Sequence, residues 1–272
     1  MYLINIIINW SELSIMTEDN KKQILRIALY AGEILLRNGA ETYRVEETIE
    51  KICKSKNLKY VNTFVTPTGI FISDDRLDGI NFIKRIKNRT IDLSKISEVN
   101  TFSRIFVEND LSFENALLQL QQIDEAKKYQ KWLVVTFSGI ASASFAILFG
   151  GNFYDFIATF FTSAIVTRSF QKMELLSETP FLSNTASGAL IALLALISKD
   201  IGIVNSIDMI IIGSIMPLVP GVALTNGLRD FISGDLISGV TRVAEATLIA
   251  ISIAVGVGSI LELWKHTFGG TF

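Results

Sequence analysis

Apolar residues recur at three- and four-residue spacing in the first part of the chain, and the pattern then changes to that of strands. Residues 18–38 and 41–54 carry the helical spacing, and Asn38-Gly39 supplies the left-handed cap with which helices commonly end. Residues 60–66 and 70–73 are instead rich in β-branched and aromatic side chains. The pattern therefore predicts two helices followed by a β-hairpin.

The remainder of the first half repeats both patterns. Residues 79–86 are interpreted as a third strand, and 96–106 and 113–123 space their apolar side chains as amphipathic helices do. Between the first two strands, Thr66-Pro67-Thr68-Gly69 is predicted to be a turn, because it lacks the glycines and the lysine of a phosphate-binding loop. Residues 1–131 are thus predicted to form a small α+β domain.

Long apolar runs dominate the chain after Lys131. A helix needs about 20 apolar residues to cross the hydrocarbon of a bilayer. Five spans are predicted, at about residues 132–150, 153–169, 181–198, 209–228 and 236–261. The second span is short and carries Asp155, which is interpreted as an interfacial residue in preference to a proton carrier. The predicted fold class is an α-helical membrane protein with an N-terminal cytosolic α+β domain.

Charge follows the same division and sets the predicted orientation. The 25 basic and 27 acidic residues are unevenly placed, since 37 of these 52 lie in residues 1–131 and 15 in residues 132–272. One side of the predicted spans carries Lys127, Lys128, Lys131, Arg168, Lys172 and Arg229, and the other carries only Lys199 and Lys265. By the positive-inside rule, the N-terminal domain is predicted to be cytosolic and the C-terminus external.

The composition excludes several classes of function. With one cysteine, Cys53, and one histidine, His266, the chain cannot hold an internal disulfide, a zinc site built on Cys and His, or a Ser-His-Asp or Cys-His catalytic group. The net charge of −2 offers no basic surface for nucleic acid. No nucleotide-binding motif is present, which argues against a primary pump, and we expect neither a cofactor nor a metal.

The fourth predicted span is broken by Pro217 and by Pro220-Gly221. Proline removes a backbone donor and clashes with the preceding turn, so the freed polar groups need protein or water around them. One interpretation is a packing kink alone. The other is that the span unwinds, so that freed carbonyls and the N-terminal end of the second half-helix line a transport path, with Asn226 as a polar contact.

Arg242 and Glu245 place charge inside the last predicted span, where charge is costly and usually functional. Their three-residue spacing allows a mutual salt bridge that would only fix the span. Alternatively, Arg242 attracts a carboxylate of the substrate, and Glu245 balances or relays charge. We favour this interpretation, because Arg229, Asp230 and Asp235 lie at the same predicted membrane face.

Small residues continue the helical row of Arg242 at every fourth position. They are Ala246, Ala250, Ala254 and Gly258. Such rows allow helices to approach closely in a membrane. We expect a second membrane subunit or another copy of this chain to cover the packing surfaces that these spans leave.

Residues 39–47 of the first half are dense in polar groups. Thr42, Glu46 and Glu50 share a helix face, which could hold an acid/base pair. The preferred interpretation is ordinary solvation by pairs four residues apart, Glu47 with Lys51 and Glu50 with Lys54.

Several of these segments together resemble the threonine/serine exporter family. They are Gly39-Ala40-Glu41-Thr42-Tyr43-Arg44-Val45-Glu46, Phe64-Val65-Thr66-Pro67-Thr68-Gly69, Leu148-Phe149-Gly150-Gly151, Pro217-Leu218-Val219-Pro220-Gly221, Asn226, Arg229-Asp230 and Ser238-Gly239-Val240-Thr241-Arg242. The resemblance runs from about residue 20 to 262. It implies a cytosolic domain before membrane spans. Because the chain ends after its fifth predicted span, it resembles the long subunit of the two-part form, similar to a component of a bacterial succinate exporter, which pairs with a short membrane-only subunit.

The sequence thus predicts an exporter subunit for a small polar metabolite, either threonine/serine or a dicarboxylate such as succinate, driven by an ion gradient. The expected partners are a small membrane-only subunit or a second copy, the small-molecule substrate and membrane lipid, and not nucleic acid. A membrane-anchored enzyme or metabolite-sensing domain of hydrolase type is the alternative. A scaffold that only assembles a partner is a third possibility.

Overall fold

A computed structural model describes residues 18–74, 80–126, 129–176, 179–204 and 206–269. The chain forms two compact units. The first unit consists of residues 1–126 and 225–242, and the second of residues 127–224 and 243–272. Helices α10 (Gly221–Ser233) and α11 (Leu236–Phe268) therefore contribute residues to both units.

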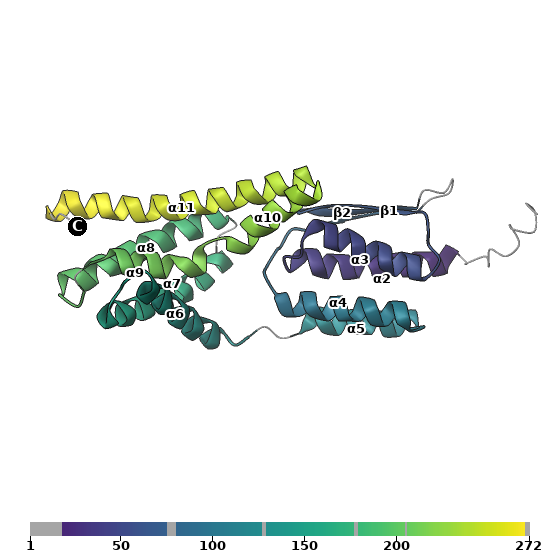
Figure 1. Cartoon of the computed structure of the whole chain (residues 1–272), viewed down its shortest axis with the longest axis horizontal. Helices are drawn as coiled ribbons and strands as arrows, with labels where there is room; N and C mark the ends of the chain where they lie inside the picture. The colour runs from purple at the N-terminus through teal and green to yellow at the C-terminus, as the bar shows by residue number, and fades with distance from the viewer. Residues whose placement is uncertain (1–17, 75–79, 127–128, 177–178, 205, 270–272) are drawn as a thin grey trace, which may run out of the picture. The chain divides into compact units, whose positions relative to one another are not determined.

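The first unit contains the α+β arrangement that the sequence predicts. Its elements are α2 (Glu18–Arg37), α3 (Thr42–Ser55), β1 (Val61–Thr66), β2 (Gly69–Asp74), β3 (Asn81–Arg85), α4 (Leu93–Glu108) and α5 (Phe113–Glu125). The strands form an antiparallel sheet in the order β1-β2-β3. In Figure 1, α2 and α3 lie between this sheet and the pair α4 and α5, and their apolar faces form the core.

Helix α2 ends in a cap that its own last residues determine. Gly39 has φ +94°, and its amide and that of Ala40 donate to the carbonyls of Leu36 and Leu35. This pair of bonds is a Schellman motif with glycine at the left-handed position. The predicted cap at Asn38-Gly39 is therefore confirmed, and the chain turns directly into α3.

The predicted hairpin is also confirmed. Thr66 pairs with Gly69 in the register of β1 and β2, so Pro67 and Thr68 form a two-residue connection. Beyond it, the amide of Ile86 donates to the carbonyl of Thr68 at 2.9 Å. The segment thus serves as a strand connection.

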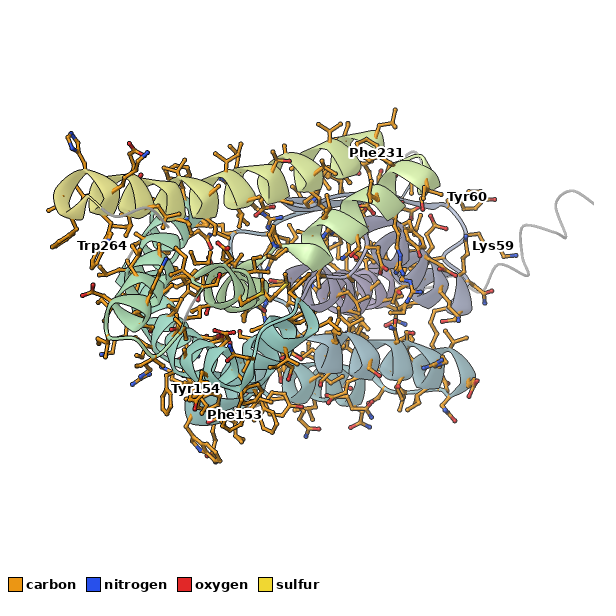
Figure 2. All side chains as sticks on the ribbon, turned by 60° about the vertical axis from the view of Figure 1, so that its left-hand side comes forward. Lys59, Tyr60, Phe153, Tyr154, Phe231 and Trp264 are labelled. Carbon is orange, nitrogen blue, oxygen red and sulfur yellow. The ribbon has the colours of Figure 1, made fainter. Side chains whose placement is uncertain are left out.

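The second unit consists of helices. They are α6 (Lys131–Leu148), α7 (Phe153–Leu176), α8 (Pro180–Asp200), α9 (Asp208–Ile215), the 3-10 turn η1 (Met216–Leu218), the first turn of α10 and the larger part of α11. Glycines allow close helix contacts: a Cβ added to Gly256 on α11 would lie 2.0 Å from the carbonyl oxygen of Thr185 on α8. Aromatic residues project outward from the start of α7, where Phe153 and Tyr154 are exposed (Figure 2).

In the described part of the chain, three helices are long and apolar enough to cross a membrane. They are α6, α8 and α11, and a fourth span results if α9, η1 and α10 count as one broken helix. Helix α7, which carries Asp155 near its start and Arg168, Lys172 and Glu174 in its second half, is not among these helices. The count of five spans therefore stays a prediction.

Candidate functional site

A buried polar cluster in the first unit joins the α2–α3 connection to residues 225–242. Asp230 on α10 is its centre and is fully buried. Its Oδ1 accepts hydrogen bonds from the amide and from Oγ1 of Thr42, at 3.3 and 2.9 Å. Glu41, which precedes α3, makes no side-chain cap bond, so Asp230 supplies the acceptor that the first turn of α3 needs.

Arg242 on α11 holds the other oxygen of Asp230. Its Nε lies 3.0 Å from Asp230 Oδ2, and its Nη2 donates to the carbonyl of Ala40 at 2.8 Å. Only 6% of Arg242 is exposed. The structure thus pairs Arg242 with Asp230, twelve residues earlier in the chain.

Two further polar residues of α10 contact the same connection. Asn226 Nδ2 donates to the carbonyl of Gly39 at 2.8 Å, and Arg229 Nη1 donates to Glu41 Oε1 at 2.5 Å. Asn226, Arg229 and Asp230 are three and four residues apart, so they share one face of the helix. Each of them therefore contacts a different residue of the segment Gly39 to Thr42.

A close helix contact and a turn place Arg242 beside Asp230. A Cβ on Gly239 would lie 2.8 Å from the ring of Phe231 and 3.0 Å from the carbonyl oxygen of Gly227, so the first turns of α11 press against α10. Gly234, with φ +92°, forms the turn between the two helices. Only a residue without a side chain fits at Gly239.

Acidic residues outnumber bases in this cluster. Asp235 Oδ2 lies 3.3 Å from Thr42 Oγ1, and Glu46 Oε1 accepts from the amide of Val65 on β1 at 2.8 Å. Burial raises the pKa of Glu46, and the charges of Asp235, Glu50 and Asp230 add to the effect. Glu46 is thus a half-buried carboxylate that ties α3 to the sheet.

The pKa of Glu41 is shifted in the opposite direction. Burial would raise its pKa, but a backbone hydrogen bond, Arg229 and Arg44 outweigh burial and hold the pKa below its ordinary value. Glu41 therefore stays ionised as the shared partner of two arginines, with Arg229 on Oε1 and Arg44 Nε at 3.6 Å from Oε2.

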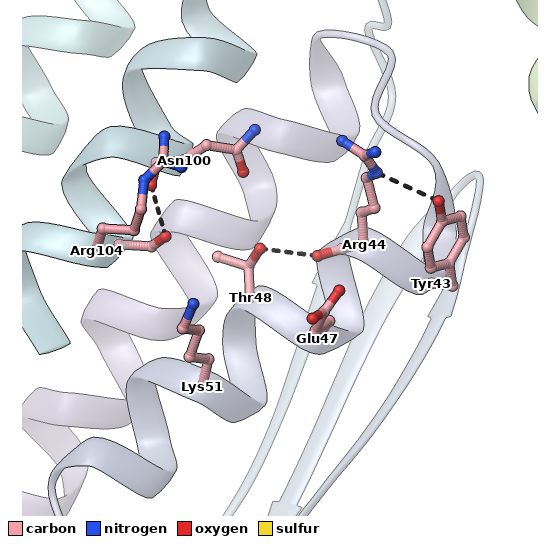
Figure 3. A pocket seen from close by; sticks show the side chains of 8 residues that line it. Tyr43, Arg44, Glu47, Thr48, Lys51, Asn100 and Arg104 are labelled. Carbon is pink, nitrogen blue, oxygen red and sulfur yellow. Dashed lines mark hydrogen bonds between the residues drawn. The ribbon is translucent and has the colours of Figure 1, made fainter.

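Arg44 points into a polar cleft of about 330 Å³ between α3 and α4 (Figure 3). There its Nε donates to the hydroxyl of Tyr43 at 3.3 Å. The cleft is lined by Tyr43, Arg44, Glu47, Thr48, Lys51, Asn100, Ser103 and Arg104. Glu50 instead pairs with Lys54 at 2.7 Å, as the sequence predicts.

The predicted site residues on α3 and the hairpin thus have separate surroundings. Thr42 contacts Asp230, Glu46 contacts β1, and Arg44 lies at the cleft. Thr66, Pro67, Thr68 and Gly69 form the hairpin turn, where Thr66 Oγ1 donates to the carbonyl of Gly69 at 3.4 Å.

The proline break lies in the second unit and is confirmed as a break in the helix. Val219 is extended between η1 and α10, and the chain bends by 57° there. Pro220 still accepts at its carbonyl from the amide of Leu224 at 3.0 Å. Pro217, Val219 and Gly221 line an apolar groove of about 810 Å³ together with residues of α6 such as Phe137.

The structure therefore divides the predicted path residues into two sets. Pro217, Pro220 and Gly221 belong to the second unit with Glu245, and Asn226, Arg229, Asp230 and Arg242 belong to the first. The capping of α3 by Asp230 was not predicted from the sequence. A helix start without an Asn, Asp, Ser or Thr cap, at Glu41, is the signal that could have suggested an acceptor from elsewhere.

Comparison with known proteins identifies the relatives of this chain. Residues 26–264 match the family described as "Putative threonine/serine exporter". The "Probable succinate transporter subunit YjjP" of Escherichia coli (strain K12) is 25% identical over 262 residues, which cover 92% of this chain and 98% of that protein. The "Threonine/serine exporter" of Corynebacterium glutamicum is 23% identical over 251 residues, 88% of this chain and 51% of that protein.

A third relative is the "Probable threonine/serine exporter" of Mycobacterium tuberculosis, which is 19% identical over 87% of this chain and 45% of its own length. No solved structure matches. These relatives are named as transporters or exporters. The match covers both the cluster around Asp230 and the helices that are apolar enough to cross a membrane, so the chain is a membrane protein. It belongs to the threonine/serine exporter family.

Proposed function

We propose that this chain is the long subunit of an exporter in the bacterial cell (inner) membrane, and that it moves a small polar metabolite out of the cytosol. The observation that carries the proposal is the buried Asp230–Arg242 pair, which joins the second half of the broken helix to the α2–α3 connection. Buried charge is costly and is kept where it serves recognition, switching or coupling. The names of the relatives supply the class of function.

The substrate that fits this cluster carries a carboxylate. Threonine, serine and succinate all do, and Arg242 and Arg229 are cations on neighbouring helices that such a group could approach. In the proposed path, substrate reaches Arg242 by displacing Asp230. The cluster would then alternate between a closed form with an internal pair and a form in which the substrate carboxylate takes the place of Asp230.

A second membrane protein completes the proposed exporter. The relative that aligns over nearly its whole length is named a subunit, whereas the two threonine/serine exporters are about twice as long as the aligned part. On α11, Ala250, Ala254 and Gly258 are exposed, and a Cβ on Gly258 would meet nothing within 4 Å. This small-residue row is the surface that we assign to the partner, which is either the short membrane-only subunit or a second copy.

Export from cells tests the proposal. Cells that lack their own exporters would be loaded with labelled succinate or labelled threonine, and efflux would be followed with this gene alone and with its candidate partner gene. We expect efflux of one substrate class, strongest with both genes. Efflux equal to that of empty cells under both conditions, with the proteins present in the membrane, would exclude the exporter.

A further inference from the structure

The polar cleft between α3 and α4 belongs to the first unit and has no part in the proposed transport path. Its volume of about 330 Å³ lies at the lower end of the range that small-molecule sites occupy. Every residue that lines the cleft has a polar or charged side chain. Figure 3 shows Glu47 and Lys51 extending from α3 on either side of Thr48, and Asn100 and Arg104 line the same cleft from α4. The cleft is therefore suited to a small polar ligand.

Lys51 and Arg104 are cations without an ion pair among the residues that the structure describes. The sequence predicts two pairs of opposite charge on α3, Glu47 with Lys51 and Glu50 with Lys54. Glu50 and Lys54 lie outside the cleft and form their pair at 2.7 Å. Glu47 and Lys51 line the cleft and form no such pair within the described part of the chain, so that prediction is wrong. Both charges are left to whatever occupies the cleft.

Two buried hydroxyl groups supply acceptors to the same cleft. Only 7% of Thr48 and 5% of Ser103 are exposed. Thr48 Oγ1 donates to the carbonyl of Arg44 at 2.8 Å, and Ser103 Oγ donates to the carbonyl of Asn100 at 2.9 Å. Because a hydroxyl has one hydrogen and two lone pairs, both oxygens are left as acceptors. A ligand with a donor group, such as an ammonium, can use these oxygens, whereas a carboxylate cannot.

A zwitterion matches this combination of groups better than an ion of one sign does. A carboxylate can bind Lys51 and Arg104 from the two helices, and an ammonium can bind Glu47. Arg44, the third cation of the cleft, is already paired with Glu41 at 3.6 Å. A dicarboxylate would bring its second carboxylate to the cleft that holds Glu47, and a simple cation would meet Lys51 and Arg104. Each of these ions would therefore place like charges together.

We propose that the cleft between α3 and α4 is a binding site for a small free α-amino acid, whose carboxylate binds Lys51 and Arg104 and whose ammonium binds Glu47. The inference goes beyond the proposed export function, because binding at this cleft requires no transport. In the proposed topology the first unit lies in the cytosol, so the site responds to the amino acid concentration inside the cell.

The first test measures binding to the purified full chain in detergent by titration calorimetry, with L-serine, L-threonine and succinate as the probes. We expect both amino acids to bind more tightly than succinate. Lys51→Met should weaken the binding of the amino acids about tenfold, because a charge-assisted hydrogen bond to the carboxylate is lost. Lys54→Met is the matched control, since Lys54 lies on the same helix and pairs with Glu50 outside the cleft. Binding of serine and threonine that is unchanged in Lys51→Met would overturn the inference.

Glu47→Gln tests the sign of the ligand's second charge. A zwitterion loses the partner of its ammonium, so we expect serine to bind about tenfold more weakly. A dianion would bind more tightly after the same change, because a like charge is removed. Glu50→Gln is the control on the same helix, and the unfolding temperature of each variant shows that the chain is still folded. Serine binding that is equal or tighter in Glu47→Gln would contradict the proposed amino acid site.

Binding and export can fail separately in these experiments. Export of succinate or threonine by a chain whose amino acid binding does not depend on Lys51 and Glu47 would overturn the cleft site and leave the exporter proposal intact. Binding that depends on both residues, in a chain that exports neither metabolite with its partner, would support the cleft site and overturn only the exporter proposal.

Discussion

At the scale of single residues, Thr42 and Asp230 show how one contact serves both structure and proposed function. The amide and hydroxyl of Thr42 both donate to the same oxygen of Asp230, so a helix in one part of the sequence is capped by a side chain 188 residues later. The second oxygen of that carboxylate neutralises Arg242. A change in either residue therefore affects folding and the candidate path together, and only paired substitutions can separate the two effects.

The first prediction separates the effect on folding from the effect on the candidate path. Asp230→Asn keeps an acceptor for Thr42 but removes the carboxylate charge beside the buried Arg242, and we expect a loss of about 3–5 kcal/mol in stability. Adding Arg242→Met should restore most of the stability, because no unpaired charge remains. Thermal unfolding of the purified variants measures this effect. Arg229→Gln is the control, since the side chain of Arg229 is 60% exposed and its ion pair with Glu41 should contribute about 1 kcal/mol or less.

Transport by the same double variant then decides the role of Arg242. If Arg242 contacts the substrate carboxylate, the folded double variant will not export. Export at the wild-type rate would mean that Asp230 and Arg242 matter only to each other. Arg242→Lys keeps the charge but loses the planar group that reaches both Asp230 and Ala40, so we expect partial export with weaker apparent affinity.

The second prediction concerns Glu46 and pH. Because burial raises the pKa of Glu46, the folded chain binds this proton more tightly than the unfolded chain does. The resulting stabilisation is fully present at a pH below 4.5, the ordinary pKa of the side chain. It is lost as the pH rises through the raised pKa of the folded chain. Glu46→Gln, which can still accept from Val65, should therefore lose less stability than the wild type as pH rises above 4.5.

Hydrogen exchange of the Val65 amide, together with the unfolding temperature at each pH, checks this result. Glu50→Gln is a suitable control, because Glu50 is paired with Lys54 at the surface of the same helix. A pH dependence that is identical in the wild type and Glu46→Gln would contradict the assignment.

At the scale of elements, features that depend on neighbouring residues were predicted from the sequence, whereas contacts between residues far apart in the chain were not. The glycine at the end of α2 and the Pro67-Thr68 turn are read from neighbouring residues, because caps and hairpins are decided within a few positions. The pairing of Arg242 with Asp230 was not predicted for the same reason. Glu245 offered a local pair, whereas Asp230 became available only when α10 and α11 folded together around Gly239.

The third prediction compares two glycines on α11. Gly256 lies against α8, where an added side chain would collide with the backbone of Thr185, whereas Gly258 has open space around it. Gly256→Leu should therefore reduce the amount of folded chain. Gly258→Leu should leave the single chain folded and weaken its assembly with the partner subunit or second copy. Co-purification and the unfolding temperature distinguish the two effects, and unchanged assembly in Gly258→Leu would rule out this face as the contact.

At the scale of the whole molecule, the number of spans sets the topology. The described helices give three spans, or four with the broken pair, and α7 is the helix on which the predicted count of five depends. With five spans the N-terminus is cytosolic and the C-terminus external, and with four both ends lie on one side. Asp155 is the charged residue near the start of α7. Because Asp155 is buried within the second unit, the surface that α7 can present to lipid is less polar than the sequence of the helix suggests.

The fourth prediction is that α7 crosses the membrane. Its 24 residues extend about 36 Å at a rise of about 1.5 Å per residue, which exceeds a hydrocarbon thickness of about 30 Å. Tyr154 and Glu174 lie near its two ends and are exposed, so a cysteine is tolerated at either position. We expect Tyr154→Cys to react with a membrane-impermeant maleimide on intact cells, and Glu174→Cys to react only after the membrane is permeabilised.

The chain suits this measurement because its own cysteine is unreactive. Cys53 is buried, and burial raises the pKa of its thiol to about 12, so little thiolate is present at neutral pH. The unmodified chain therefore gives the labelling background, and Asp200→Cys, on the exposed end of α8, gives a second position that we expect to be external. Equal labelling of Tyr154→Cys and Glu174→Cys on intact cells, or of neither, would mean that α7 does not cross. Both ends of the chain would then lie on the same side of the membrane.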